Sequence, residues 1–169
     1  MTTRGKILET ERLVLRKLTL DDAQFIFELV NEPAFIQNIG DKNVHDLDDA
    51  REYLTKGPLT SYDQYGFGLF LVMRKEDQAP IGMCGIIKRE EFDFPDVGFA
   101  FKSIYWRRGY ASEAAGATLA WGRNEVGLPK IIAITSATND ASAAVLEKIG
   151  LRFEGMVEFN GNLDNRLFS

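Results

Sequence analysis

The segment 105–114, YWRRGYASEA, combines residue types that could bind an anion. The first N–H groups of a helix have no partner within the helix, and the helix dipole adds positive potential at that end. Gly109 would let an anion approach the backbone, Ala111 keeps the first turn small, and Arg107 and Arg108 add positive charge. The segment therefore predicts a pyrophosphate site at a helix start. The alternative is a tight glycine loop before an alanine-rich core helix, with two solvated arginines.

The other common chemical motifs are absent from the sequence. There is no G-x-x-x-x-G-K-[ST] phosphate loop, and Gly66 and Gly68 lack the third glycine of a dinucleotide fingerprint. His45 and Cys84 are the only residues of their types, so we expect no metal site. We interpret His45 as a capping or surface residue. Cys84 lies in an apolar run and is interpreted as a core residue, not as a nucleophile.

Composition limits the class of protein. The chain has 169 residues, 45% of them hydrophobic, and a formal net charge of −5. This length fits a single domain over residues 1–169, and the acidic excess argues against a nucleic-acid partner. One cysteine excludes an intrachain disulfide, so a reducing, cytoplasmic setting is expected. No apolar run approaches the roughly 20 residues of a membrane span, and we expect no membrane partner.

Periodicity and capping residues predict the elements that would position this site. The pattern predicts a strand at 12–18, helices at 20–30 and 50–57, strands at 67–75, 80–90 and 96–101, a helix at 111–126, a strand at 130–137, a helix at 139–150, and a final pair of strands at 151–159 and 162–168. Thr19, Asp46 and Asn139 are expected N-caps. Pro33 is expected to stop the first helix and Gly57-Pro58 the second. This order predicts an α/β fold with a mixed sheet and helices on its faces.

Three segments carry a resemblance to a known family. The segments DVGFAFKSIYWRRGYASEAAGATLAWG and NDASAAVLEKIGLRFEG look like the acetyl-CoA-binding core of the GNAT N-acetyltransferases. They are most similar to the RimJ/RimL-like branch, which acetylates the N-termini of ribosomal proteins, and the opening ETERLVLRKLTLDDA resembles that branch too. The resemblance implies a twisted, mostly antiparallel central sheet of about six or seven strands with about four helices.

The resemblance also implies how acetyl-CoA, as cosubstrate, would be held. The family's phosphate loop follows [Q/R]-x-x-G-x-[G/A], and here Trp106 takes its first position. The backbone amides of the loop would bind the CoA pyrophosphate; they belong to Arg107, Arg108, Gly109, Tyr110 and Ala111. The strand residues Phe99, Ala100 and Phe101 would pair with pantetheine and donate an N–H to the thioester carbonyl, stabilising its oxyanion. Asn139 would contact the pantetheine arm.

The catalytic residues implied by the resemblance are Ser142 and Glu158. The Ser142 hydroxyl would lie near the sulfur and protonate the leaving thiolate. Many family members use a tyrosine four residues further on, where this chain has Leu146. Glu158 is the candidate general base, although its alternation with apolar neighbours fits a solvated strand face equally well. Asp96 and Glu154 are the other candidate carboxylates.

The implied reaction is direct acetyl transfer to a primary amine, expected to be the N-terminal α-amine of a protein or peptide. Two alternatives stay open: a small amine such as an amino acid or antibiotic, and a CoA-binding module without catalysis. Either a monomer or a homodimer is compatible with the sequence. Four aromatic or aliphatic residues are candidates to line the acceptor groove or to pack the core: Phe35, Ile36, Tyr62 and Tyr65. The acidic segment 88–96 would either attract a cationic acceptor or form a solvated rim.

Overall fold

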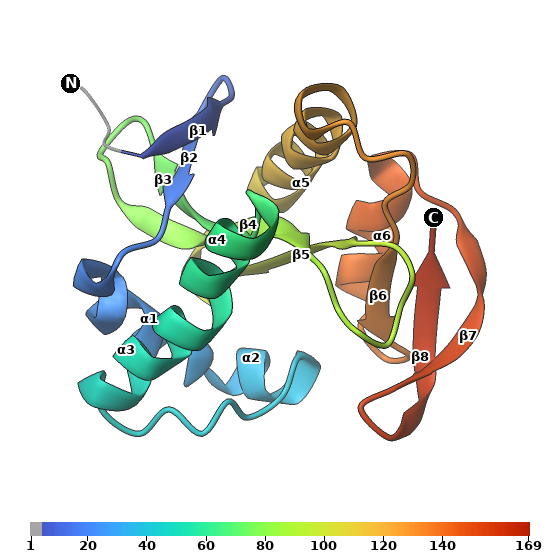
Figure 1. Ribbon diagram of the computed structural model, residues 1–169, viewed down its shortest axis with the longest axis horizontal. Helices are drawn as coiled ribbons and strands as arrows, with labels where there is room; N and C mark the ends of the chain where they lie inside the picture. Colours follow the sequence, from blue (N-terminus) through green and yellow to red (C-terminus); the bar gives the residue numbers. More distant parts are fainter. Residues whose placement is uncertain (1–4) are drawn as a thin grey trace.

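A computed structural model describes residues 5–169, and its first layer is an antiparallel sheet of five strands (Figure 1). In sheet order the strands are β1 (Lys6–Glu9), β2 (Leu13–Lys17), β3 (Leu69–Arg74), β4 (Pro80–Ile87) and β5 (Asp96–Phe101). Every neighbouring pair runs antiparallel. The hairpin of β3 and β4 and the strand over residues 96–101 confirm the sequence prediction.

A second sheet of three strands follows, in the order β6 (Ala133–Ser136), β8 (Asn162–Phe168) and β7 (Phe153–Phe159). Its strands are also antiparallel. The turn between β7 and β8 has positive φ at Asn160 (54°) and Gly161 (75°), as a type I′ turn requires. Figure 1 shows this sheet and α6 grouped beside the free edge of β5.

Helices cover both faces of the five-stranded sheet. They are α1 (Ala23–Val30), α2 (Pro33–Asn38), α3 (Leu47–Leu54), α4 (Thr60–Tyr65), α5 (Tyr110–Trp121) and α6 (Asp140–Lys148). Side chains alternate across a strand, so Phe70 and Val72 of β3 enter the core shared with α5. Leu71 between them enters the core formed with α1 and α3. The sheet is therefore a middle layer between two hydrophobic cores.

β4 lies at the centre of this layer and is buried from Ile81 to Ile86. Two of its glycines are positions where neighbouring backbone leaves no space for a side chain. A Cβ on Gly85 would overlap the carbonyl oxygen of Gly68 and lie 2.7 Å from the Cα of Leu69. A Cβ on Gly82 would lie 2.9 Å from the Cα of Phe101. These glycines allow the close spacing of β3, β4 and β5.

The predicted N-caps are confirmed. Thr19 forms a reciprocal capping box with Asp22 before a short 3₁₀ turn that leads into α1. The Asp46 carboxylate accepts a hydrogen bond from the Asp49 backbone N–H at 2.7 Å and begins α3. The amide oxygen of Asn139 accepts one from the Ser142 N–H and begins α6. These local bonds fix where the helices start.

The structure corrects three boundaries. Pro33 begins α2 as its first residue, where the missing N–H of proline is harmless. Gly57-Pro58 does not end the second helix, because a π-type turn over Thr55–Leu59 accommodates the ring and continues into α4. The sequence analysis also missed β1. Within residues 5–169 the protein therefore has eight strands and six α-helices, more than expected, in the predicted α/β architecture.

Two features are absent from residues 5–169. No helix there is both long and apolar enough to cross a membrane. In the same part of the chain, no group of three or more His, Cys, Asp or Glu side chains could hold a metal ion.

The close strand spacing at Gly85 leads to a stability prediction. Gly85→Ala should lower the free energy of unfolding by about 3 kcal/mol, because its methyl group would press on backbone atoms that cannot move aside. Gly116→Ala is the matched control in α5, where the nearest atom to the new Cβ is the Ile149 side chain at 3.6 Å. The free energy of unfolding of this control should rise by up to about 1 kcal/mol, because alanine has a higher helix propensity than glycine. Urea unfolding of both variants measures the difference, and equal stability would contradict the packing assigned to β4.

Candidate functional site

A large cavity opens where β5 and β6 separate. The two strands meet at one parallel bridge, Asp96 with Ile132, where the Val97 N–H donates to the Ile132 carbonyl at 2.9 Å. The Ile132 N–H in turn donates to the Pro95 carbonyl at 2.9 Å. Beyond this bridge both strands line a cavity of about 1160 Å³. The separation exposes one edge of β5 to the cavity.

The backbone direction of β5 determines which groups this edge presents. N–H groups alternate sides along a strand, and that of Val97 points toward β6. The N–H and carbonyl of Phe99 therefore point into the gap. Across it, the hydroxyls of Thr135 and Ser136 are buried and have no hydrogen-bond partner within the described residues. An extended ligand with amide groups would satisfy this edge as a further strand would.

The start of α5 forms one end of the cavity. Gly109 takes a left-handed φ of 82°, and no side chain caps the helix. Arg107 also has a positive φ, 63°. Arg107, Gly109, Tyr110 and Ala111 line the cavity, together with Ser112. The uncapped amides, the helix dipole and the guanidinium make this end suited to a phosphate group.

Arg108, predicted with this group, lies outside the cavity lining. Its guanidinium sits over the Tyr105 ring, 5.8 Å from the ring centroid, and its carbonyl accepts a hydrogen bond from Arg12 Nη1 at 3.0 Å. Its backbone belongs to the same turn. Of the two arginines in this turn, only Arg107 lines the cavity.

An ion pair that the sequence analysis missed anchors the start of α5. Glu113 accepts hydrogen bonds from the Arg12 backbone N–H at 2.9 Å, from Arg12 Nε at 2.7 Å and from the Thr10 hydroxyl. Arg12 also lies over the Tyr110 ring, 4.4 Å from its centroid. Burial alone would raise the pKa of Glu113, but the hydrogen bonds from Thr10 and Arg12 hold that pKa below its usual value. The segment just before β2 thereby fixes the start of α5.

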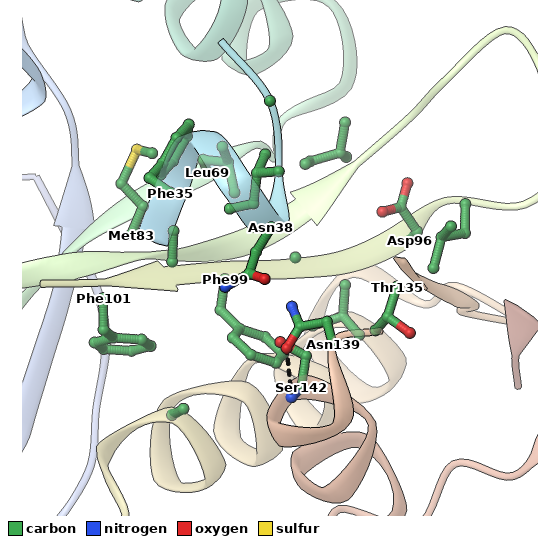
Figure 2. Close-up of a pocket in the computed structure, with 18 of the residues that line it drawn as sticks. Phe35, Asn38, Leu69, Met83, Asp96, Phe99, Phe101, Thr135, Asn139 and Ser142 are labelled. Carbon is green, nitrogen blue, oxygen red and sulfur yellow. Dashed lines mark hydrogen bonds between the residues drawn. The ribbon is translucent and has the colours of Figure 1, made fainter. Parts of the chain in front are cut away.

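The opposite wall comes from α6 (Figure 2). Asn139 lies at its start, with Ser142 one turn along, and the dashed line between them is the capping bond of 3.2 Å. Both residues line the cavity, as does Leu146. In Figure 2, Asn139 and Ser142 lie next to Phe99 of β5. The structure thus brings together three predicted residues from two separate segments of the chain.

Asp96 places a carboxyl group in the cavity at the start of β5. Its side chain is 4% exposed and accepts a hydrogen bond from Arg89 Nε at 2.9 Å. Burial raises the pKa of Asp96, and the Arg89 charge only partly offsets this effect. A carboxylate with a raised pKa is a stronger base, which suits it to accept a proton near neutral pH.

Glu158 and Glu154 do not reach the cavity. Both are exposed on β7 and neither is among the lining residues. Phe159 lines the cavity instead, because neighbouring side chains of a strand point to opposite faces. A role for Glu158 is therefore a prediction that this arrangement does not support, and Asp96 is the better placed of the candidate carboxyl groups.

The part of the cavity lined by α2 and the β4–β5 connection is called the distal end here. Phe35, Ile36 and Asn38 line it from α2, and Tyr65 lines the cavity from α4. Figure 2 shows Asn38 reaching from α2 toward Phe99. Tyr62, by contrast, is a core residue: its hydroxyl accepts a hydrogen bond from the Leu18 N–H at 3.0 Å and donates to the Leu69 carbonyl.

Cys84 is a core residue, as the sequence predicted. It is fully buried in β4 next to the Thr118 hydroxyl, 3.4 Å away. Burial raises the pKa of its thiol to about 12. The thiolate, which is the nucleophilic form, is therefore negligible at neutral pH.

Comparisons with known proteins agree with this geometry. A family model described as an acetyltransferase (GNAT) domain matches residues 12–152. The chain is 30% identical to YnaD, an uncharacterized N-acetyltransferase of Bacillus subtilis (strain 168), over 148 residues that cover 88% of this chain and 84% of YnaD. An acetyltransferase structure from Agrobacterium tumefaciens str. C58 is similar with a TM-score of 0.83 and 25% identity, over 99% of this chain and 95% of that one. RimL, a ribosomal-protein alpha-N-acetyltransferase solved with coenzyme A, has a TM-score of 0.80 and 17% identity over 96% of both chains.

The anchor at Glu113 leads to a prediction of pH-dependent stability. Its pKa is lowered in the folded protein, so its contribution is complete above the unfolded pKa of about 4.3 and is lost as the pH falls through the folded value. Glu113→Gln should lower the free energy of unfolding by about 1 kcal/mol at about pH 7, since the pair is partly exposed. The difference between wild type and variant should be smaller at about pH 3 than at about pH 7, because below its pKa of about 4.3 the carboxyl group of the unfolded chain binds a proton.

Urea titrations at both pH values measure this difference. Glu147→Gln is the control, because it removes the same charge from an exposed position of α6. A pH-independent difference for Glu113→Gln would show that its carboxylate charge does not anchor the helix start.

Proposed function

The chain belongs to the GNAT family of acetyltransferases, which use acetyl-CoA, and we propose that its acceptor is the N-terminal α-amine of a peptide or protein. In this proposal residues 1–169 form one acetyltransferase domain of the RimJ/RimL-like branch. The sequence segments around the α5 turn and the start of α6, which resemble that branch, support the acceptor class. The similarity to the RimL structure supports the fold alone, because the two chains are 17% identical.

One observation carries the proposal: a single cavity joins the uncapped start of α5, the free edge of β5 and the distal end. This order matches the parts of the reaction. The α5 turn suits the pyrophosphate, the β5 edge suits the amide-bearing pantetheine arm, and the distal end has space for an acceptor. Thr135 and Ser136 also line this cavity, and their buried hydroxyls have no hydrogen-bond partner within residues 5–169.

Acetyl-CoA supplies an acetyl group activated as a thioester. The residues around it would act on its carbonyl oxygen, its sulfur and its pantetheine arm. The Phe99 N–H points into the gap and would donate to the carbonyl oxygen as negative charge develops there. Ser142 lines the cavity from the first turn of α6 and would donate a proton to the departing sulfur. Asn139 would hold the pantetheine arm against β5.

The proton of the attacking amine needs an acceptor, and Asp96 is the carboxyl group best placed for it. It is buried, lines the cavity and has a raised pKa. A free α-amine has a pKa of about 8, compared with about 10.4 for lysine, so it needs less help to lose its proton near neutral pH. A weak carboxylate base is therefore compatible with an α-amine acceptor.

The phosphate turn can be tested at Gly109. Gly109→Glu should abolish the thermal stabilisation by acetyl-CoA, because it places a strained side chain and a negative charge at the proposed pyrophosphate site. Saturating acetyl-CoA should raise the melting temperature of the wild type by roughly 5–10 °C. Gly127→Glu is the matched control: Gly127 has a similar φ, 83°, at the end of the same helical segment and does not line the cavity.

The control variant should keep the full acetyl-CoA shift although it carries the same backbone strain. Loss of the shift in both variants would mean that strain, not the pyrophosphate contact, explains the effect. An unchanged shift in Gly109→Glu would rule out the α5 turn as the phosphate site.

The two candidate carboxylates can be compared directly. Asp96→Asn should reduce kcat by about 100-fold, the usual cost of losing a general base, with an unchanged acetyl-CoA melting shift. Glu158→Gln should leave kcat within about twofold of wild type, because Glu158 is exposed on β7 and outside the cavity lining. CoA release with a panel of peptides beginning in Ala, Ser or Met, and with small amines, measures both. A large loss in Glu158→Gln alone would reverse the assignment.

A further inference from the structure

The charges that line the cavity differ in sign from those of the protein as a whole. The chain carries 25 acidic and 20 basic residues, excluding histidine. Five cationic side chains but only two carboxylates line the cavity. Arg107 is the cation at the α5 turn. The other charged side chains belong to Lys42, Lys56, Lys88, Arg89, Glu90 and Asp96.

Two of the distal cations are neutralised or satisfied by the protein. Lys56 pairs with Glu52 one turn earlier. Lys88 donates to the carbonyls of Arg89 and Phe92, at 2.7 and 2.6 Å. Both therefore have protein partners, unlike Lys42 and the Nη groups of Arg89 within the described residues.

Lys42 and Arg89 present donors that no described residue uses. Within residues 5–169, Lys42 forms no ion pair, although it lines the cavity. Arg89 uses Nε for Asp96 and rests its guanidinium over the Phe159 ring, 4.8 Å from the centroid, which leaves both Nη groups without a protein partner in the described chain. Desolvation and then the charge of Arg89 lower the pKa of Lys42. Lys42 follows α2 and Arg89 follows β4, and both line the cavity, so the free donors of both could bind one anion there.

This pair is too far from the α5 turn to serve the same phosphates. Arg89 contacts Asp96, the first residue of β5, whereas the α5 turn follows the last residue, Phe101. A strand of this length spans on the order of 17 Å. The pyrophosphate site and the Lys42–Arg89 pair thus lie at opposite ends of β5, with the acetyl-transfer position between them.

We propose that Lys42 and Arg89 form an anion subsite for the acceptor, and that the preferred acceptor is an amine with a carboxylate close to it. This inference rests on the proposed acetyl transfer and adds the chemistry of the acceptor. Arg89 touches Asp96, so a carboxylate bound by Arg89 would lie near an amine whose proton Asp96 accepts. One residue of chain, about 3.8 Å between Cα atoms, is a suitable spacing. An acidic second residue in a peptide, or the α-carboxylate of a free amino acid, provides it.

The cavity lining also bears on the acidic segment 88–96, for which the sequence left a cationic acceptor and a solvated rim as alternatives. Of its four acidic residues only Glu90 and Asp96 line the cavity, and Asp96 is already paired with Arg89. Four lysine and arginine side chains line this part of the cavity against these two carboxyl groups, so its formal charge remains positive.

The test uses pairs of acceptors in which a carboxylate is replaced by the neutral amide of similar size. Wild-type kcat/KM is measured for the amidated peptides Ala-Glu-Ala-Ala and Ala-Gln-Ala-Ala, and for alanine against alaninamide. In at least one pair the carboxylate member should be preferred by about tenfold. Lys42→Gln should remove most of that preference through KM, with kcat nearly unchanged, and should alter the neutral member by less than about twofold. Lys42→Arg should restore the preference.

Lys148→Gln is the matched control, because Lys148 is an exposed lysine of α6 that does not line the cavity. Preference in the peptide pair supports an acidic N-terminus, and preference in the amino-acid pair supports a free amino acid; both support the subsite. Equal use of both members of each pair, or an equal loss on both in Lys42→Gln, overturns the subsite while acetyl transfer stands. If the enzyme releases no CoA from acetyl-CoA with any of the amines, both the subsite and the proposed function are wrong.

Discussion

The site depends on one point of contact between two sheets. The backbones of Pro95, Val97 and Ile132 exchange hydrogen bonds, and beyond this point β5 and β6 separate. Continued pairing would fill the gap with protein and leave no free N–H at Phe99. If β5 and β6 separated before this bridge, β6 would no longer cover the hydrophobic core. The bridge thus fixes how much strand edge stays open, and an open edge with buried polar groups is stable only when water or a ligand satisfies it.

The same bridge places the candidate base. Asp96 is the residue of β5 that pairs with Ile132, so its backbone is held by both sheets while its carboxyl group enters the cavity. Arg89 at the end of the preceding strand keeps that carboxyl oriented. At the other end of β5, Arg12 and Glu113 fix the α5 turn. The cavity therefore has a rigid anchor at each end, and the position for chemistry lies between two elements that cannot shift independently.

Local signals in the sequence predicted the elements correctly where a few neighbouring residues decide the structure. The Thr19 capping box, the Asn139 cap and the Asn160-Gly161 turn are such cases. Features that depend on distant residues were missed. Arg12 and Glu113 are 101 positions apart, and no short pattern links them. The π-type turn at Pro58 depends on burial of the proline ring in the core, which propensity does not report.

The choice between Glu158 and Asp96 as the candidate base shows which part of the site could not be predicted from the sequence. Glu158 and Phe159 are neighbours on β7, and which of the two faces the cavity is set by strand register. A shift of one residue would exchange their positions, and the alternating sequence fits either arrangement. Asp96 has no such freedom, because its backbone pairs with Ile87 of β4 and with Ile132, the residue before β6. A residue fixed by two strands is better suited to hold a reacting proton than one on an edge strand with a bulge beside it, and β7 has its register shift between Val157 and Phe159.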